Sequence, residues 1–167
     1  QGVNYVLALD ADTRLCPGAA REMVGAMLHP LCRPEIDPQR HIVTAGHGIL
    51  APRMSVELSA AGRSRFARLF AGQGGTDPYG GVGGDVYMDL CGHGSFAGKG
   101  LIDVDAYLRC LGDRIPEDTV LSHDTLEGAF LRCAYAGGIE LTDGFPSRPS
   151  AWLHRLERWT RGDWQNL

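Results

Sequence analysis

The run Tyr5-Val-Leu-Ala-Leu9, which is followed by Asp10-Ala-Asp12, decides the fold class of this chain. A continuous apolar run closed by an aspartate is typical of a strand that is buried on both faces of an α/β sheet. The chain has 167 residues, which is enough for one domain with its own core and too short for two. We therefore expect a single α/β domain over residues 1–167.

Helical and extended patterns alternate along the rest of the chain. We expect a helix after Pro17 that runs to Leu28, and further helices over 64–70, 105–111, 124–134 and 151–164. We expect strands over 42–50 and 139–141. The glycine-rich stretch 71–84 predicts a mobile loop, and such loops often carry binding residues.

Composition and charge exclude several classes of protein. Hydrophobic residues make up 44% of the chain and charged residues 22%, which argues against disorder and predicts a soluble domain. The net charge of −4 argues against a protein held to nucleic acid by a general basic field. The five cysteines form no C-x-x-C pair, which favours reduced thiols over a disulfide framework or a zinc site. No apolar run approaches the ~20 residues of a membrane span.

Asp10 and Asp12 form the first candidate site, because they follow the first strand at the edge where open α/β sheets bind ligands. Two carboxylates one residue apart can share Mg²⁺ or Mn²⁺ and hold it against a diphosphate. That chemistry suits a nucleotide-diphosphate substrate. In the alternative interpretation, Asp10 is a turn residue at the strand end, and Asp12 or Thr13 caps a helix.

Asp124 is the second candidate, as a general base at the start of a helix. A carboxylate there can accept a proton from an attacking hydroxyl within hydrogen-bond reach. The alternative is a helix cap, because Asp124 and Glu127 have the spacing of a capping box.

The last predicted helix carries the third candidate site. Its arginines suit phosphate and its indoles suit stacking on a sugar. The residues concerned are Arg155, Arg158, Trp159, Arg161 and Trp164. The alternative is an amphipathic helix that packs on the domain or lies on a membrane surface.

Taken together and in this order, these motifs resemble the processive inverting glycosyltransferases of GT-A fold. Within that superfamily the chain is similar to the glycosyltransferase domain of cyclic β-1,2-glucan synthases, over nearly its whole length. The stretches that carry the resemblance are 9–14, Asp77-Pro-Tyr79, Asp85-Val-Tyr87, 94–104, Leu121-Ser-His-Asp124, Phe145-Pro-Ser147 and 158–165. The resemblance implies a GT-A-like mixed sheet flanked by helices, and an incomplete one.

The resemblance also implies an activity and assigns residues to it. Glucose would pass from UDP-glucose to the 2-hydroxyl of a growing β-1,2-glucan with inversion. Asp10 and Asp12 match the motif for the metal, Mg²⁺ or Mn²⁺, and Asp124 matches the general base. Arg158 and Trp159 match a Q-x-x-R-W motif that contacts donor and acceptor.

Other positions are matched less fully. Arg155 stands where many members of the superfamily have Gln, and Arg161 and Trp164 lie in the same donor- and acceptor-binding segment. Phe96, Gly98 and Lys99 fall on a segment that lines the sugar site, although the resemblance gives Lys99 no role.

A GT-A domain normally builds its uridine pocket from elements that precede D-x-D, and here that motif begins at residue 10. We therefore expect the chain to be part of a larger enzyme at the cytoplasmic face of the bacterial inner membrane, inactive alone and prone to dimerise. One alternative is a non-catalytic glucan-binding or interaction module. Another is a D-x-D-x-T phosphatase, although Thr13 comes one position too early and Arg14 takes the fifth place.

Overall fold

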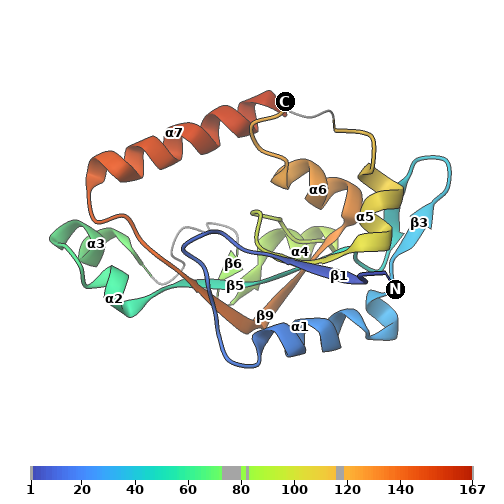
Figure 1. Cartoon of the computed structure of the whole chain (residues 1–167), viewed down its shortest axis with the longest axis horizontal. Helices are drawn as coiled ribbons and strands as arrows, with labels where there is room; N and C mark the ends of the chain where they lie inside the picture. The colour runs from blue at the N-terminus through green and yellow to red at the C-terminus, as the bar shows by residue number, and fades with distance from the viewer. Residues whose placement is uncertain (1, 73–79, 82, 116–118, 167) are drawn as a thin grey trace.

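The computed structural model describes residues 2–72, 80–81, 83–115 and 119–166. A five-stranded mixed sheet lies at the centre of this part of the chain (Figure 1). In spatial order its strands are β1 (Tyr5–Ala8), β8 (Gly100–Asp103), β5 (Ile49–Val56), β9 (Cys133–Asp143) and β2 (Arg14–Leu15). This mixed α/β architecture agrees with the class predicted from the sequence.

Strand direction decides where functional side chains can meet. β8 is antiparallel to both of its neighbours, β1 and β5, whereas β5 and β9 are parallel. The strands β1, β5 and β9 therefore all point the same way. Their carboxyl ends, together with the residues that lead into β8, lie at one edge of the sheet, which we call the carboxyl edge.

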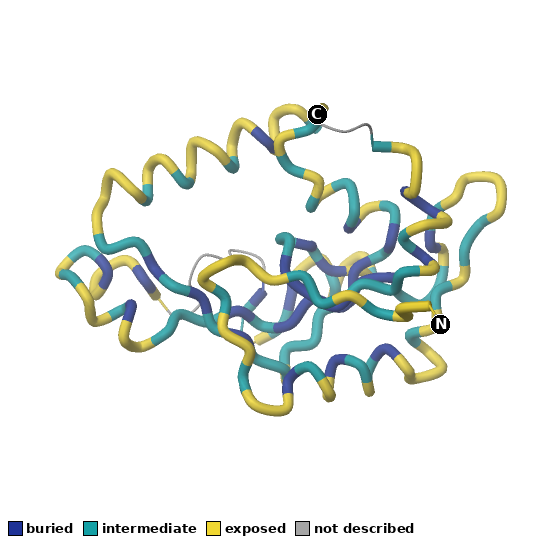
Figure 2. Tube along the Cα trace, in the orientation of Figure 1, coloured by how far each residue is buried: buried dark blue, intermediate teal, exposed yellow. Residues whose placement is uncertain are grey.

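Helices cover both faces of the sheet (Figure 1). One face is covered by α1 (Ala19–Met27), and the other by α5 (Val104–Leu111) and α6 (Asp124–Leu131). The shorter helices are α2 (Leu58–Ala61), α3 (Arg65–Phe70), α4 (Val86–Cys91) and the 3₁₀ turn η1 (Pro30–Cys32). Two small hairpins pair β3 (Glu35–Asp37) with β4 (Ile42–Ala45) and β6 (Gly80–Gly81) with β7 (Gly84–Asp85). The long helix α7 (Pro149–Gln165) ends the chain, and most of its outer surface is exposed (Figure 2).

The core forms where β5 is covered from both sides. Ile49 and Ala51 pack with α5 and α6, whereas Leu50, between them, packs with Met23 and Met27 of α1. This alternation follows from the two-residue repeat of a strand, which sends neighbouring side chains to opposite faces. β5 is therefore the strand buried on both faces.

That role was expected for the first strand, and this prediction is wrong. β1 is an edge strand whose pairing partner in the described residues is β8, and Val6 is 48% exposed. The single strand predicted over 42–50 is also wrong. Gly46, at φ +64, separates β4 from β5, and a Cβ at this position would collide with the backbone carbonyl of Arg33. β5 then continues through Pro52, where its register against β9 shifts.

The helix predicted over 124–134 is shorter than expected. Arg132 adopts a left-handed conformation at φ +54 and ends α6, so that residues from Cys133 onward form the long strand β9 instead of a helix. Helix α4 was not expected; the side chain of its N-cap Asp85 accepts a hydrogen bond from the Met88 N–H. The helix after Pro17 and the helices over 64–70, 105–111 and 151–164 are confirmed. Most of the predicted loop over 71–84, namely 73–79 and 82, lies outside the described residues.

Candidate functional site

Three charged side chains meet at the carboxyl edge. The ammonium group of Lys99, just before β8, lies 3.0 Å from Oδ2 of Asp10 and 3.5 Å from Oδ2 of Asp143. Asp10 follows β1 and Asp143 ends β9, so strands that are distant in sequence bring the three together. Lys99 and Asp143 are buried, with 7% and 2% of their side chains exposed, whereas Asp10 is 45% exposed. The cluster is therefore anchored inside the domain and opens to solvent through Asp10.

Hydrogen bonds fix the loop that carries Asp10. The hydroxyl of Thr13 donates to Oδ1 of Asp143 at 2.5 Å, and the Thr13 N–H donates to the backbone carbonyl of Asp10 at 3.0 Å. The Thr13 end of the tight turn 10–13 is thus tied to β9, and its Asp10 end is tied to Thr13 and to Lys99. Asp143 was missed in the sequence analysis, although its position just after a predicted strand resembles that of Asp10.

The charge balance of the cluster explains the state of Lys99. Burial alone would lower the pKa of Lys99, but the carboxylates of Asp143 and Asp10 outweigh burial and raise that pKa above its ordinary value. Lys99 therefore carries a positive charge at neutral pH. With two carboxylates around one ammonium, the cluster keeps one excess negative charge.

Asp124 lies next to this cluster, as the first residue of α6. A Cβ atom on Gly98 would come within 2.8 Å of Oδ2 of Asp124, so the carboxylate rests against the backbone of the loop that carries Lys99. Burial raises the pKa of Asp124, and the negative charge of Asp10 adds to this, whereas Lys99 opposes it. The structure thus brings Asp124, Asp10 and Lys99 into one charged group.

The capping-box interpretation of Asp124 is wrong. The N-cap of α6 is His123, whose side chain makes no capping hydrogen bond in the part of the chain that the structure describes. Glu127 does not turn back to the helix start either, because its carboxylate accepts a hydrogen bond from the Tyr107 hydroxyl at 3.3 Å. Asp124 is therefore free of a capping role.

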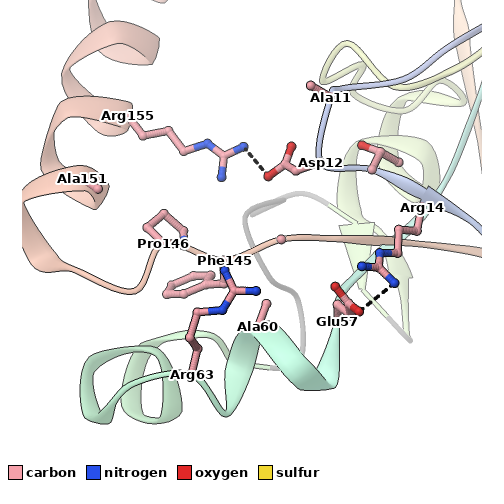
Figure 3. Close-up of a pocket in the computed structure, with 12 residues that line it drawn as sticks. Ala11, Asp12, Arg14, Glu57, Ala60, Arg63, Phe145, Pro146, Ala151 and Arg155 are labelled. Atoms are coloured by element: carbon pink, nitrogen blue, oxygen red, sulfur yellow. Dashed lines mark ion pairs between the residues drawn. The ribbon is translucent and has the colours of Figure 1, made fainter.

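A cleft of about 500 Å³ lies beside the cluster, between the turn 10–13, α2 and α7. In Figure 3 the guanidinium of Arg155 is directed at the carboxylate of Asp12, 3.7 Å away. Arg14 and Arg63 also line the cleft, and Arg14 pairs with Glu57 at 3.0 Å. The position where relatives were expected to have Gln thus carries a cation that faces the D-x-D motif.

Aromatic rings pack against one another along α7 and on the segment just before it. Phe145 stacks on Trp152 with a centroid distance of 5.3 Å, and Trp152 meets Trp159 edge to face at 6.3 Å. The guanidinium of Arg155 lies over the Trp159 ring, 5.2 Å from its centroid. These contacts fix Trp159 and Arg155 on the helix face that looks towards Asp12.

The other predicted residues of α7 lie elsewhere on the helix. Arg161 and Trp164 line a separate cavity of about 430 Å³ with Leu121, because Trp164 is about two and a half turns beyond Arg155. Arg158 is exposed. Gly162 is buried because its backbone packs on Ser122. A Cβ on Gly162 would come within 2.6 Å of the Cβ of Ser122. The structure therefore does not bring all five residues of this segment to one site.

Phe96 is a core residue, with 6% of its surface exposed. It is buried in the core with α5 and α6 and packs against Gly128. Its contact with a sugar stays a prediction.

The carboxylates of Asp10 and Asp12 are accessible enough to bind a divalent cation. Both are 45% exposed, and Mg²⁺ is commonly held by one or two carboxylates together with substrate phosphates. Within 2–72, 80–81, 83–115 and 119–166, no group of three or more His, Cys, Asp or Glu is arranged to hold a metal by itself. A cation here would therefore need oxygen ligands from a substrate.

The fold and the site define a mixed α/β domain with a charged cluster at the carboxyl ends of its strands. No protein-family model matches the sequence. The chain is 46% identical over 168 aligned residues to the cyclic β-(1,2)-glucan synthase NdvB of Rhizobium meliloti (strain 1021), and it is homologous to a small part of that protein. The alignment takes in the whole chain and 6% of the length of NdvB. In the described residues, no helix is long and apolar enough to cross a membrane.

Proposed function

We propose that this chain forms the catalytic part of an inverting glycosyltransferase of GT-A type that transfers glucose from UDP-glucose to a β-1,2-glucan. The observation that carries the proposal is the 46% identity to a cyclic β-(1,2)-glucan synthase along the whole chain. The grouping of Asp10, Lys99 and Asp124 at one sheet edge supports it, because open α/β sheets bind ligands there.

The proposed reaction is a single displacement. The acceptor 2-hydroxyl oxygen bonds to the anomeric carbon of glucose, the bond from that carbon to the diphosphate oxygen breaks, and UDP leaves with the electron pair. Asp124 accepts the hydroxyl proton. Burial raises the pKa of this carboxylate, which makes it a stronger base than an exposed aspartate. Inversion follows because the attack comes from the face opposite the leaving group.

The remaining residues bind and orient the substrates. Asp10 and Asp12 would hold Mg²⁺ or Mn²⁺, which when bound neutralises the charge of the departing diphosphate. Arg155 and Arg158 are proposed to contact the diphosphate, and Trp159 to stack on a sugar ring. The uridine is proposed to contact other parts of a longer protein, which acts at the cytoplasmic face of the inner membrane.

The test is a transfer assay on the full-length protein that contains this chain. Membranes that carry it should incorporate labelled glucose from UDP-glucose into a β-1,2-linked product. Asp124→Asn should abolish incorporation, whereas Asp105→Asn, on an exposed aspartate of α5, should leave it unchanged. A full-length protein that binds no UDP-glucose, or an Asp124→Asn variant with parental turnover, would contradict the proposal.

A further inference from the structure

Lys99 is the only lysine in the chain; every other basic side chain apart from histidine is arginine. It is also among the most buried charged residues, with 7% of its side chain exposed. Lysine is rarely buried to this degree unless it is paired. The pairing partners of this buried ammonium group therefore indicate its role.

Asp143 alone would be enough to balance the charge of a purely structural lysine. It is 2% exposed, and within the described part of the chain its Oδ2 accepts no hydrogen bond, so the ammonium at 3.5 Å is its charge partner. Yet Lys99 makes its shorter contact with Asp10, at 3.0 Å, whose carboxylate is half exposed. The ammonium thus reaches from a buried anchor to the solvent-facing side of the site.

The backbone on both sides of Lys99 supports this placement. Gly98 has φ +78, and a side chain there would collide with the Asp124 carboxylate. Gly100 lies so close to Leu50 that a Cβ would come within 2.5 Å of its carbonyl oxygen. Two positions that exclude side chains therefore place Lys99 between β5 and α6, with Asp10 in front of it.

We propose that Lys99 is a positioning residue of the transfer site: anchored on Asp143, it holds the Asp10 carboxylate in one orientation towards the donor and supplies a fixed positive charge beside Asp124. The inference rests on the proposed function and extends it to a residue to which the family resemblance assigns no role. One oxygen of Asp10 is held by the ammonium, which leaves the other available to a donor hydroxyl or a divalent cation.

A purely structural pair and a positioning residue respond differently to removal of both charges. Lys99→Met alone leaves Asp143 buried without a cation, which is destabilising whatever the role of the lysine. Lys99→Met with Asp143→Asn removes both buried charges, and the amide still accepts the Thr13 hydrogen bond. Such neutral replacements of buried pairs often restore stability. Asp10, however, remains without its ammonium partner.

The experiment uses the full-length protein in four forms: parental, Lys99→Met, Lys99→Met/Asp143→Asn, and Asp105→Asn/Arg109→Met as a control that removes an exposed ion pair of α5. For each, the melting temperature, the Kd for UDP-glucose and the turnover at saturating donor are measured. We expect the melting temperature to fall in the single variant and to return close to the parental value in the buried-pair double variant. The Kd for UDP-glucose should still be raised about tenfold in that variant, equivalent to about 1.4 kcal/mol. The control should match the parental protein in all three.

Asp10→Asn gives a second measure of the same contact. It weakens the Lys99 contact without burying an unpaired charge, so it should raise the donor Kd to a similar degree. Adding Lys99→Met/Asp143→Asn to Asp10→Asn should cause little further loss, because coupled residues are not additive.

Four results would overturn the proposal. A buried-pair double variant with parental stability, Kd and turnover would make Lys99 structural. The same conclusion would follow if the melting temperature of the double variant did not recover. It would also follow if the increases in the Kd for UDP-glucose caused by the double variant and by Asp10→Asn added in full. A parental protein that binds no UDP-glucose would overturn the proposed function itself, and with it this inference; that result is visible before any variant is made.

Discussion

Replacement of Gly98 by alanine should disable the site while leaving the fold largely intact. The new Cβ would lie 2.8 Å from Oδ2 and 3.1 Å from Cγ of Asp124, closer than real contacts allow. The carboxylate or the loop must therefore move by several tenths of an ångström. The backbone, at φ +78, adds about 1–2 kcal/mol because alanine disfavours left-handed conformations.

Gly18→Ala is a matched control for the backbone effect. Gly18 has φ +87, and its nearest neighbour would be the flexible end of Glu22 at 3.6 Å, which is an ordinary contact. Both variants should lose about 1–2 kcal/mol of stability from the backbone alone. Only Gly98→Ala should lose transfer, by about tenfold or more, because a displacement of about 1 Å at a reacting group can cost about a hundredfold.

The assay is glucose transfer by the full-length protein, with the melting temperature measured in parallel. Equal turnover in the two alanine variants would refute the view that Asp124 must stay where Gly98 allows it. A loss of UDP-glucose binding in Gly98→Ala would show instead that the loop that carries Lys99 has moved, and not the Asp124 carboxylate.

Asp124→Asn should keep UDP-glucose binding and lose transfer, because an amide cannot take a proton; binding by calorimetry and turnover separate the two. The same variant should be more stable than the parent near neutral pH. Burial raises the pKa of Asp124 in the folded state above its ordinary value of 3.8, so the folded protein binds this proton more tightly than the unfolded chain, and stability falls as pH rises from that value through the raised one. The free energy of unfolding of both forms, measured from about pH 3 to about pH 7, tests this; a difference between the two forms that does not change with pH would contradict it. Asp10→Ala and Asp12→Ala should each remove metal-dependent binding of UDP-glucose, and parental affinity with Mg²⁺ or Mn²⁺ in both would exclude them as ligands. The 167-residue chain alone should not transfer glucose and should dimerise through the exposed edge strand β1, so robust turnover by a monomer in a light-scattering experiment would contradict both expectations.

Local patterns were enough to predict several elements of this chain. The strand at Tyr5, the helix capped by Ser64 and the long terminal helix depend on apolar spacing and capping residues within a few positions. The candidate residues Asp10 and Asp124 were also found this way, because each stands at the end or start of such an element. Homology to a small part of a glucan synthase agrees with the resemblance that these motifs indicated.

Only the tertiary structure decided how the strands are ordered and which charges meet. β1 and β5 have similar apolar sequences, yet pairing places one at the edge and the other at the centre, and pairing depends on residues far away in the chain. The contact of Lys99 with Asp10 spans 89 positions, and that of Thr13 with Asp143 spans 130. No local pattern encodes such contacts. They arise because β1, β5 and β9 run in the same direction and deliver their carboxyl ends, with the loop before β8, to one edge of the sheet.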